Sequence, residues 1–240
     1  MRRASPFLAL LILAGIMRAP CAPAQPSPDT AALIAAVKAQ YDRIQDYTVD
    51  IRAVVKMTGL SVPPMDAVMY FKKPDRVRLK SDGFAMLPRD AVGFHPGMFE
   101  TEAYDMVVQG KEKVQGIECT KVKLLARSDT TRLQRAMLFI DTKRSVILRM
   151  EFDPGAGAKA SASLTYARVD GKYWLPERID VEMDSPRQMR RPGQQVRPND
   201  GAKPEKARIV MTYRNYVVNR GIDDAVFDAK PSPSSRRGRN

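Results

Sequence analysis

The chain has 240 residues, of which 44% are hydrophobic and 28% charged, a composition that excludes fibrous, collagen-like and wholly disordered classes. One histidine and two cysteines exclude a three-histidine or four-cysteine metal site. Lysine and arginine exceed aspartate and glutamate by 13, so anionic partners are expected.

The first 24 residues have the pattern of a signal peptide. Arg2 and Arg3 precede an apolar run, Phe7 to Met17, that is too short to span a bilayer. Ala22 to Ala24 offers a small–x–small cleavage site. We therefore expect a mature chain that begins at Gln25 and is exported to the periplasm.

Export changes how the cysteines and the positive charge are interpreted. Cys21 is lost with the leader, or it is retained as a lipid-anchored cysteine, although Arg18 and Pro20 fit a lipobox poorly. After cleavage Cys119 alone remains, so no internal disulfide is expected. An exported basic protein meets anionic membrane surfaces and acidic proteins, and nucleic acid is not an expected partner.

The segment after the leader begins with helical spacing and then alternates. Apolar residues from Ala31 to about Asp46 recur at helical intervals and predict one amphipathic helix. Alternation then predicts strands over 48–57, 65–73 and 76–80. Prolines and glycines interrupt 84–104, which we interpret as a short irregular excursion, a lid against the sheet.

Alternating strands with short turns fill most of the remaining chain. No strand–helix–strand alternation appears, so the pattern predicts a mainly β domain over 25–230 with a single large curved antiparallel sheet. Residues 231–240 have the composition of a basic disordered tail. The later strands are expected over 105–109, 113–114, 117–127, 133–141, 145–152, 159–169, 173–183 and 207–218.

A catalytic centre is not expected. His95 is the only histidine and lies in the irregular segment, and no nucleophile motif surrounds any serine. Carboxylate pairs such as Asp180 and Glu182 fall on the polar face of a strand. We expect no catalytic residues, no metal and no cofactor, and an exported hydrolase that uses His95 is the weakest hypothesis.

The number and placement of the apolar residues indicate that the protein binds an apolar ligand. Thirteen methionines are many for this length, and several fall on the inward face of predicted strands. Core packing explains each position by itself. As a group they indicate a cavity or groove for an apolar ligand, because only one helix and one lid are expected to cover the apolar face of a large sheet. The expected cavity residues are Val49, Ile51, Val55, Met57, Met69, Phe71, Leu148, Met150, Val181 and Met211.

Positive charge is concentrated between Ser185 and Lys206. The stretch is either a solvated insertion or a docking patch for anionic lipid headgroups or an acidic partner. The candidate docking residues are Arg187, Arg190, Arg191 and Arg197.

Several short patterns, in this order, resemble those of LolA-like outer-membrane lipoprotein-sorting proteins. The resemblance implies an unclosed antiparallel β-barrel with helices as a lid over an apolar cavity. It also implies binding of lipoprotein acyl chains or other hydrophobic ligands in the Gram-negative envelope, and no catalytic residues. The Arg-rich stretch 186–204 and the lid sequence depart from the pattern. The patterns are DYTV at 46–49, MYFKKPDRVRL at 69–79, KVQGIEC at 113–119, FID at 139–141 with LRM at 148–150, DGKYWLP at 170–176 and YVVNRGIDDAVF at 216–227.

These features together predict a periplasmic carrier. It would hold acyl chains of lipoproteins or other lipids in the apolar cavity for transport to the outer membrane. Its expected protein partners are other components of envelope transport. The alternative is an envelope sensor or scaffold domain of the same fold that binds a protein partner through the Arg-rich stretch.

Overall fold

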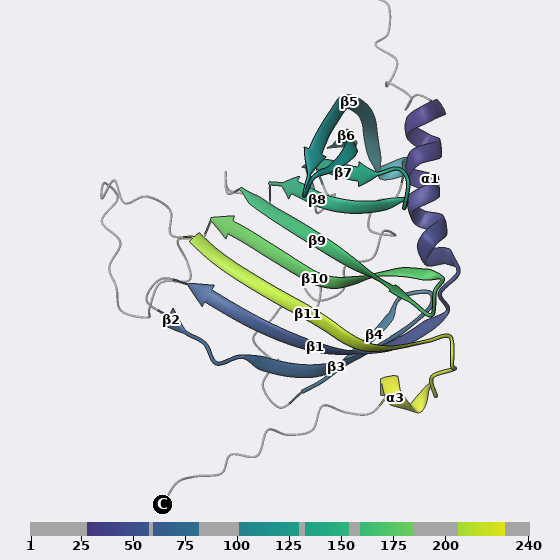
Figure 1. Cartoon of the computed structure of the whole chain (residues 1–240), viewed down its shortest axis with the longest axis vertical. Coiled ribbons are helices and arrows are strands. Elements are labelled where there is room, and N and C mark those ends of the chain that lie inside the picture. The colour runs from purple at the N-terminus through teal and green to yellow at the C-terminus, as the bar shows by residue number, and fades with distance from the viewer. Residues whose placement is uncertain are drawn as a thin grey trace, which may run out of the picture.

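One large antiparallel sheet and one long helix make up the described part of the chain (Figure 1). The computed structural model describes residues 28–57, 60–81, 101–129, 133–153, 159–184 and 206–228. The helices there are α1 (Pro28–Asp42) and the short α3 (Ala225–Asp228), and a 3-10 turn spans Thr101–Ala103. The strands are β1 (Asp46–Met57), β2 (Leu60–Ser61), β3 (Met65–Lys72), β4 (Arg76–Lys80), β5 (Tyr104–Val114), β6 (Ile117–Ala126), β7 (Arg135–Asp141), β8 (Val146–Phe152), β9 (Ala160–Val169), β10 (Tyr173–Asp184) and β11 (Lys206–Val218).

The strands join in the order β4-β3-β1-β11-β10-β9-β8-β7-β6-β5, with β2 beside β1. Neighbouring strands are antiparallel throughout. β4 and β5 stand at the two ends of this order, so the sheet curves without closing, and α1 runs across one end of it (Figure 1). The expected fold class, a single curved antiparallel sheet forming an unclosed β-barrel with an N-terminal helix, is confirmed. The expected lid lies almost wholly outside the described residues.

The helix is shifted from its predicted span. It begins at Pro28, whose missing N–H suits a first helical position, and it ends at Asp42. The prediction had placed the end near Asp46, but Asp46 is already the first residue of β1. Ile44, expected on the helix, is buried in the connection that follows it.

Gly110 does not make the predicted turn. β5 runs through it to Val114, and the pairing with β6 shifts register between Val108 and Lys111. Gly110 has φ 104, a backbone conformation that glycine adopts readily. Glycines with positive φ occur in β-bulges as well as in turns. The chain reverses instead at Gln115 and Gly116, which have φ 52 and 79.

Alternation along the expected strands 76–80 and 207–218 places Val77 and Val217 on the inward side, but both are exposed. Val77, on the edge strand β4, is 37% exposed, and Val217 of β11 is 49% exposed. The pairing of β1 with β11 shifts register between Thr48 and Asp50, and Asn215 has φ 55. This irregularity changes the alternation, so that Val218, not Val217, is buried.

The main core lies between α1 and one face of the sheet, which we call the inner face. Ile34 and Val37 of α1 pack in one cluster with strand residues such as Ile51, Leu138 and Leu148. A second, smaller cluster contains Ile44 and three strand residues: Phe71, Leu175 and Val218.

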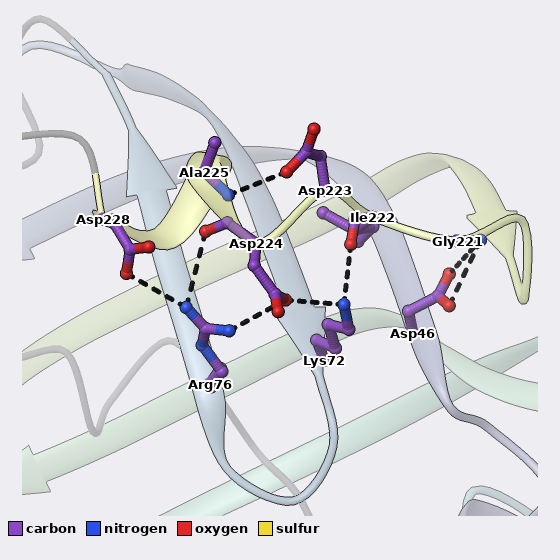
Figure 2. A network of polar contacts seen from close by, with 9 residues as sticks. All are labelled: Asp46, Lys72, Arg76, Gly221, Ile222, Asp223, Asp224, Ala225 and Asp228. Atoms are coloured by element: carbon purple, nitrogen blue, oxygen red, sulfur yellow. Dashed lines mark hydrogen bonds and ion pairs between the residues drawn. The ribbon is translucent and has the colours of Figure 1, made fainter.

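A buried carboxylate holds the corner where α1 meets the sheet. Asp46 is 7% exposed, and its Oδ1 accepts hydrogen bonds from the backbone N–H groups of Arg220 (3.1 Å) and Gly221 (3.2 Å). Figure 2 shows the second of these contacts. The start of β1 is thereby joined to the segment that follows β11.

The same C-terminal segment is tied to the β3–β4 hairpin (Figure 2). Lys72 Nζ donates to the carbonyl of Ile222 (2.8 Å) and pairs with Asp224 Oδ1 (2.6 Å). Arg76 pairs with Asp224 (2.8 Å) and Asp228 (3.1 Å). These contacts place α3 against the edge strand β4.

Candidate functional site: the apolar rim of the inner face

The inner face carries apolar side chains in rows that cross the strands. One deep row pairs Ala53 with Met211, Met211 with Ile179 and Ile179 with Leu164. None of these four residues is more than 3% exposed. This part of the inner face is closed core.

Burial decreases toward one end of the sheet, where β1, β8 and β10 end and β7, β9 and β11 begin. We call this the rim end. Val55, Ile209 and Val181 lie opposite one another in the next row and are half-buried. The last row runs from Met57 through Ala207, Met183 and Ala160 to Phe152, and its three large side chains are again half-buried. The half-buried set, which we call the apolar rim, is Val55, Met57, Phe152, Val181, Met183 and Ile209.

The composition of the apolar rim suits an adaptable apolar contact. In the last row alanines alternate with large side chains, because Ala207 separates Met57 from Met183 and Ala160 separates Met183 from Phe152. Alanine presents only a methyl group, while methionine is flexible and polarisable. A contiguous half-exposed apolar surface is a feature of ligand and membrane sites.

The ten residues expected to line a cavity separate into three groups. Phe71 lies in the second cluster, with its ring stacked on Tyr47 at 5.0 Å. Val55, Met57 and Val181 belong to the apolar rim. The other six are buried in the main core: Val49, Ile51, Met69, Leu148, Met150 and Met211.

Three apolar rim residues were missing from the expected site. Alternation had placed Phe152, Met183 and Ile209 on the inward side of their strands. Their place in the same rows as Val55 and Met57 depends on the register of each strand pair from β1 through β11, β10 and β9 to β8. Cross-strand register of this kind has no local signal in the sequence.

Deeper in the inner face a group of tyrosines closes the space near α1. A cavity of about 10 Å³ there is lined by Tyr41, Tyr47, Tyr213, Tyr216 and neighbouring apolar residues. This is room for about one water molecule at most. Burial raises the pKa of Tyr47 and Tyr213 well above the usual value, so both stay uncharged.

A groove of about 560 Å³ lies at the rim end, and Phe152 and Met183 of the apolar rim are part of its lining. The lining also includes residues that lie opposite one another across β6 to β10: Lys123, Met137, Glu151, Ser161 and Glu182. Because strand side chains alternate, these residues project away from the inner face. The acids and bases of this groove set the charge of the rim end.

Several expected functional residues lie outside the described residues. They are Cys21, His95 and the docking candidates Arg187, Arg190, Arg191 and Arg197. The stretch that carries these four arginines connects Asp184 to Lys206, so both of its ends join the rim end.

The described residues offer no metal centre, since no group of three His, Cys, Asp or Glu among them could hold an ion. Cys119 is fully buried, and burial raises the pKa of its thiol. This fits the structural role expected for it. Within the described ranges, no helix has the length and apolar character needed to cross a membrane.

Comparison with known proteins defines the class of fold. No family model and no curated protein matches the chain. A DUF1329 family protein from Desulfovibrio piger shares its fold, with 16% identity over 82% of this chain and 96% of that chain and a TM-score of 0.56. The chain thus shares the fold of that protein, and the resemblance to LolA-like proteins inferred from the sequence is confirmed at the level of fold alone.

Two other solved structures resemble the chain more distantly. A putative outer membrane lipoprotein-sorting protein domain from Vibrio parahaemolyticus is 13% identical over 81% of this chain and 95% of that chain, with a TM-score of 0.48. A LolA superfamily protein from Nitrosomonas europaea is 9% identical over 81% of this chain and 96% of that chain, with a TM-score of 0.47. At such identities the likeness concerns the fold alone.

Proposed function

We propose that the protein is a periplasmic carrier that binds acyl chains of lipoproteins or other lipids on its inner face, for transport toward the outer membrane. The observation that carries the proposal is the apolar rim. Its six large side chains, from four strands, form one half-buried apolar surface, and four of them pack against the main core: Val55, Phe152, Val181 and Ile209. The buried members of the expected cavity, such as Met150 and Met211, are the floor beneath this surface.

The energetics suit reversible binding. A chain that removes about 200 Å² of apolar surface from water gains about 5 kcal/mol at about 25 cal/mol per Å². That corresponds to a dissociation constant of about 10⁻⁴ M before other costs or contacts. A carrier that must load and release its cargo works in such a regime, whereas a permanently buried cofactor would not.

The test is uptake of a fluorescent fatty acid, together with native mass spectrometry of protein purified without detergent. Met57→Lys and Met183→Lys each place a charge on the apolar rim, where partial exposure lets the fold accept it. We expect each to weaken uptake about tenfold or more, since a lysine beside the chain must be desolvated. Ser163→Lys is the matched control, because Ser163 projects from the opposite face of β9.

Thermal unfolding of all three variants separates lost binding from lost folding. Unchanged uptake by folded Met57→Lys and Met183→Lys would place the ligand elsewhere. A clean apo mass with no uptake by the unaltered protein would overturn the carrier role and leave the fold for a protein-binding task.

A further inference from the structure

Among the described residues, the rim end carries five basic side chains that have no acidic partner. Lys56, one residue before the end of β1, is exposed, and the groove at the rim end is lined by the other four. None of the five forms an ion pair with another described residue. These residues, which we call the rim-end cations, are Lys56, Lys123, Arg135, Lys159 and Lys206.

Four acids also line the groove, and within the described residues no ion pair joins any of them to a rim-end cation; the four are Glu151, Asp153, Glu182 and Asp184. Glu151 pairs with Arg149 at 2.8 Å. Glu182 lies 3.6 Å from Arg208. Asp184 Oδ2 accepts the backbone N–H of Lys159 at 3.2 Å. None of these contacts uses the ammonium or guanidinium group of a rim-end cation.

Basic residues at the opposite end of the strands show a contrasting arrangement. Figure 2 shows Lys72 and Arg76 both held by Asp224, with Arg76 also on Asp228. Lys73 there lies 3.6 Å from Asp42. These three basic residues at the end away from the apolar rim are thus neutralised, unlike the rim-end cations.

We propose that the rim end docks on an anionic lipid bilayer, with the apolar rim against the acyl region and the rim-end cations at the headgroups. The proposal rests on the proposed function in one respect, since the docked surface contains the acyl site. This end of the sheet presents the apolar rim on its inner face and unpaired basic residues on its opposite face, and that amphipathic character is typical of interfacial membrane binders. An acidic protein would use the cations but would not account for the apolar rim beside them.

The experiment compares two triple variants in a vesicle sedimentation assay. Lys123→Gln with Lys159→Gln and Lys206→Gln removes three rim-end cations. Lys113→Gln with Lys143→Gln and Lys172→Gln removes three exposed lysines at the opposite end. Both triples lose the same charge and keep residues 185–205, so their difference reports position alone.

We expect the unaltered protein to bind vesicles of phosphatidylcholine with phosphatidylglycerol and to bind pure phosphatidylcholine weakly. The rim-end triple should bind the anionic vesicles about tenfold less or worse, and the control triple should stay close to the unaltered protein. Added salt should weaken binding of the unaltered protein.

Equal loss in both triples, or no vesicle binding at all, would overturn the docking surface. In the second case capture by acidic protein alone would assign the rim-end cations to a protein partner. Uptake of a water-soluble short-chain fluorescent acid, measured without vesicles, keeps the two proposals separate. Vesicle binding without such uptake contradicts the carrier, and uptake without position-dependent vesicle binding contradicts the docking surface.

Discussion

Lys72 and Asp224 are 152 residues apart in the chain, yet Lys72 Nζ lies 2.6 Å from Asp224 Oδ1. The contact joins the β3–β4 hairpin at the sheet edge to the segment that follows the last strand. Arg76 reinforces it from the other side of the same carboxylate at 2.8 Å. An unclosed sheet has two free edges, and this network fixes one of them to the end of the described chain.

This carboxylate predicts a pH dependence. The hydrogen bond from Lys72, with the nearby Arg76, lowers the pKa of Asp224 from its usual value. A carboxyl group with a depressed pKa contributes stability above its unfolded pKa of about 3.9, and this contribution is lost as the pH falls through the folded pKa. Asp224→Asn should therefore lower the melting temperature at pH 7 and narrow its difference from the unaltered protein in acid. A constant difference across an acid titration followed by circular dichroism would contradict this role.

Asn219 is predicted to matter through both its backbone and its side chain. Its φ is 53, and its Oδ1 accepts the backbone N–H of Gln45 at 2.7 Å while its Nδ2 donates to the carbonyl of Arg43 at 2.9 Å. Asn219→Ala loses these bonds and strains a left-handed residue, so we expect about 2 kcal/mol lower free energy of unfolding. Asn219→Gly loses the same bonds without the strain and should cost less. Urea unfolding measures both, and equal costs would exclude a backbone contribution.

Two buried tyrosines provide a matched pair of single-oxygen changes. Tyr166 donates its hydroxyl to the carbonyl of Ile147 at 2.9 Å and so bridges β9 to β8. Tyr41 of α1 has a buried hydroxyl that lies beside Tyr166, but within the described structure it has no hydrogen bond of standard geometry. Tyr166→Phe should lower the free energy of unfolding by about 1–2 kcal/mol, because a buried carbonyl loses its donor. Tyr41→Phe should be neutral or stabilising, and a larger cost there would show that its hydroxyl is bonded.

Much of the fold follows from local patterns in the sequence. The two-residue alternation of Val49, Ile51 and Ala53 is enough to predict β1 and its buried side, and all three are in the core. Breakers and hairpin signals such as Asp170 and Gly171, with φ 49 and 66, separate the strands where expected. The antiparallel class follows because these strands succeed one another without intervening helices.

The candidate site is less accessible to such reasoning, for a physical reason. Met57 and Met183 belong to one row only because Ala207 lies opposite both, and such pairing joins residues far apart in the chain. Bulges are hidden in the same way, since a glycine at positive φ serves a turn or a bulge equally well, as Gly110 does. The expected residues therefore included the floor of the inner face, but only three members of the apolar rim.

The irregularity in β11 leads to a prediction in which two adjacent valines behave oppositely. Uninterrupted alternation would bury Val217 and expose Val218. The register shift near Asp50 and the left-handed Asn215 reverse this, so Val217 is 49% exposed and Val218 is 4% exposed. Val217→Ser should change the free energy of unfolding by no more than about 0.5 kcal/mol, as is usual for surface positions. Val218→Ser should cost about 2 kcal/mol, because it empties part of the second core cluster and buries a hydroxyl. Equilibrium urea unfolding of the two variants decides between the registers. The reverse order of costs would mean that β11 continues to its end without the irregularity.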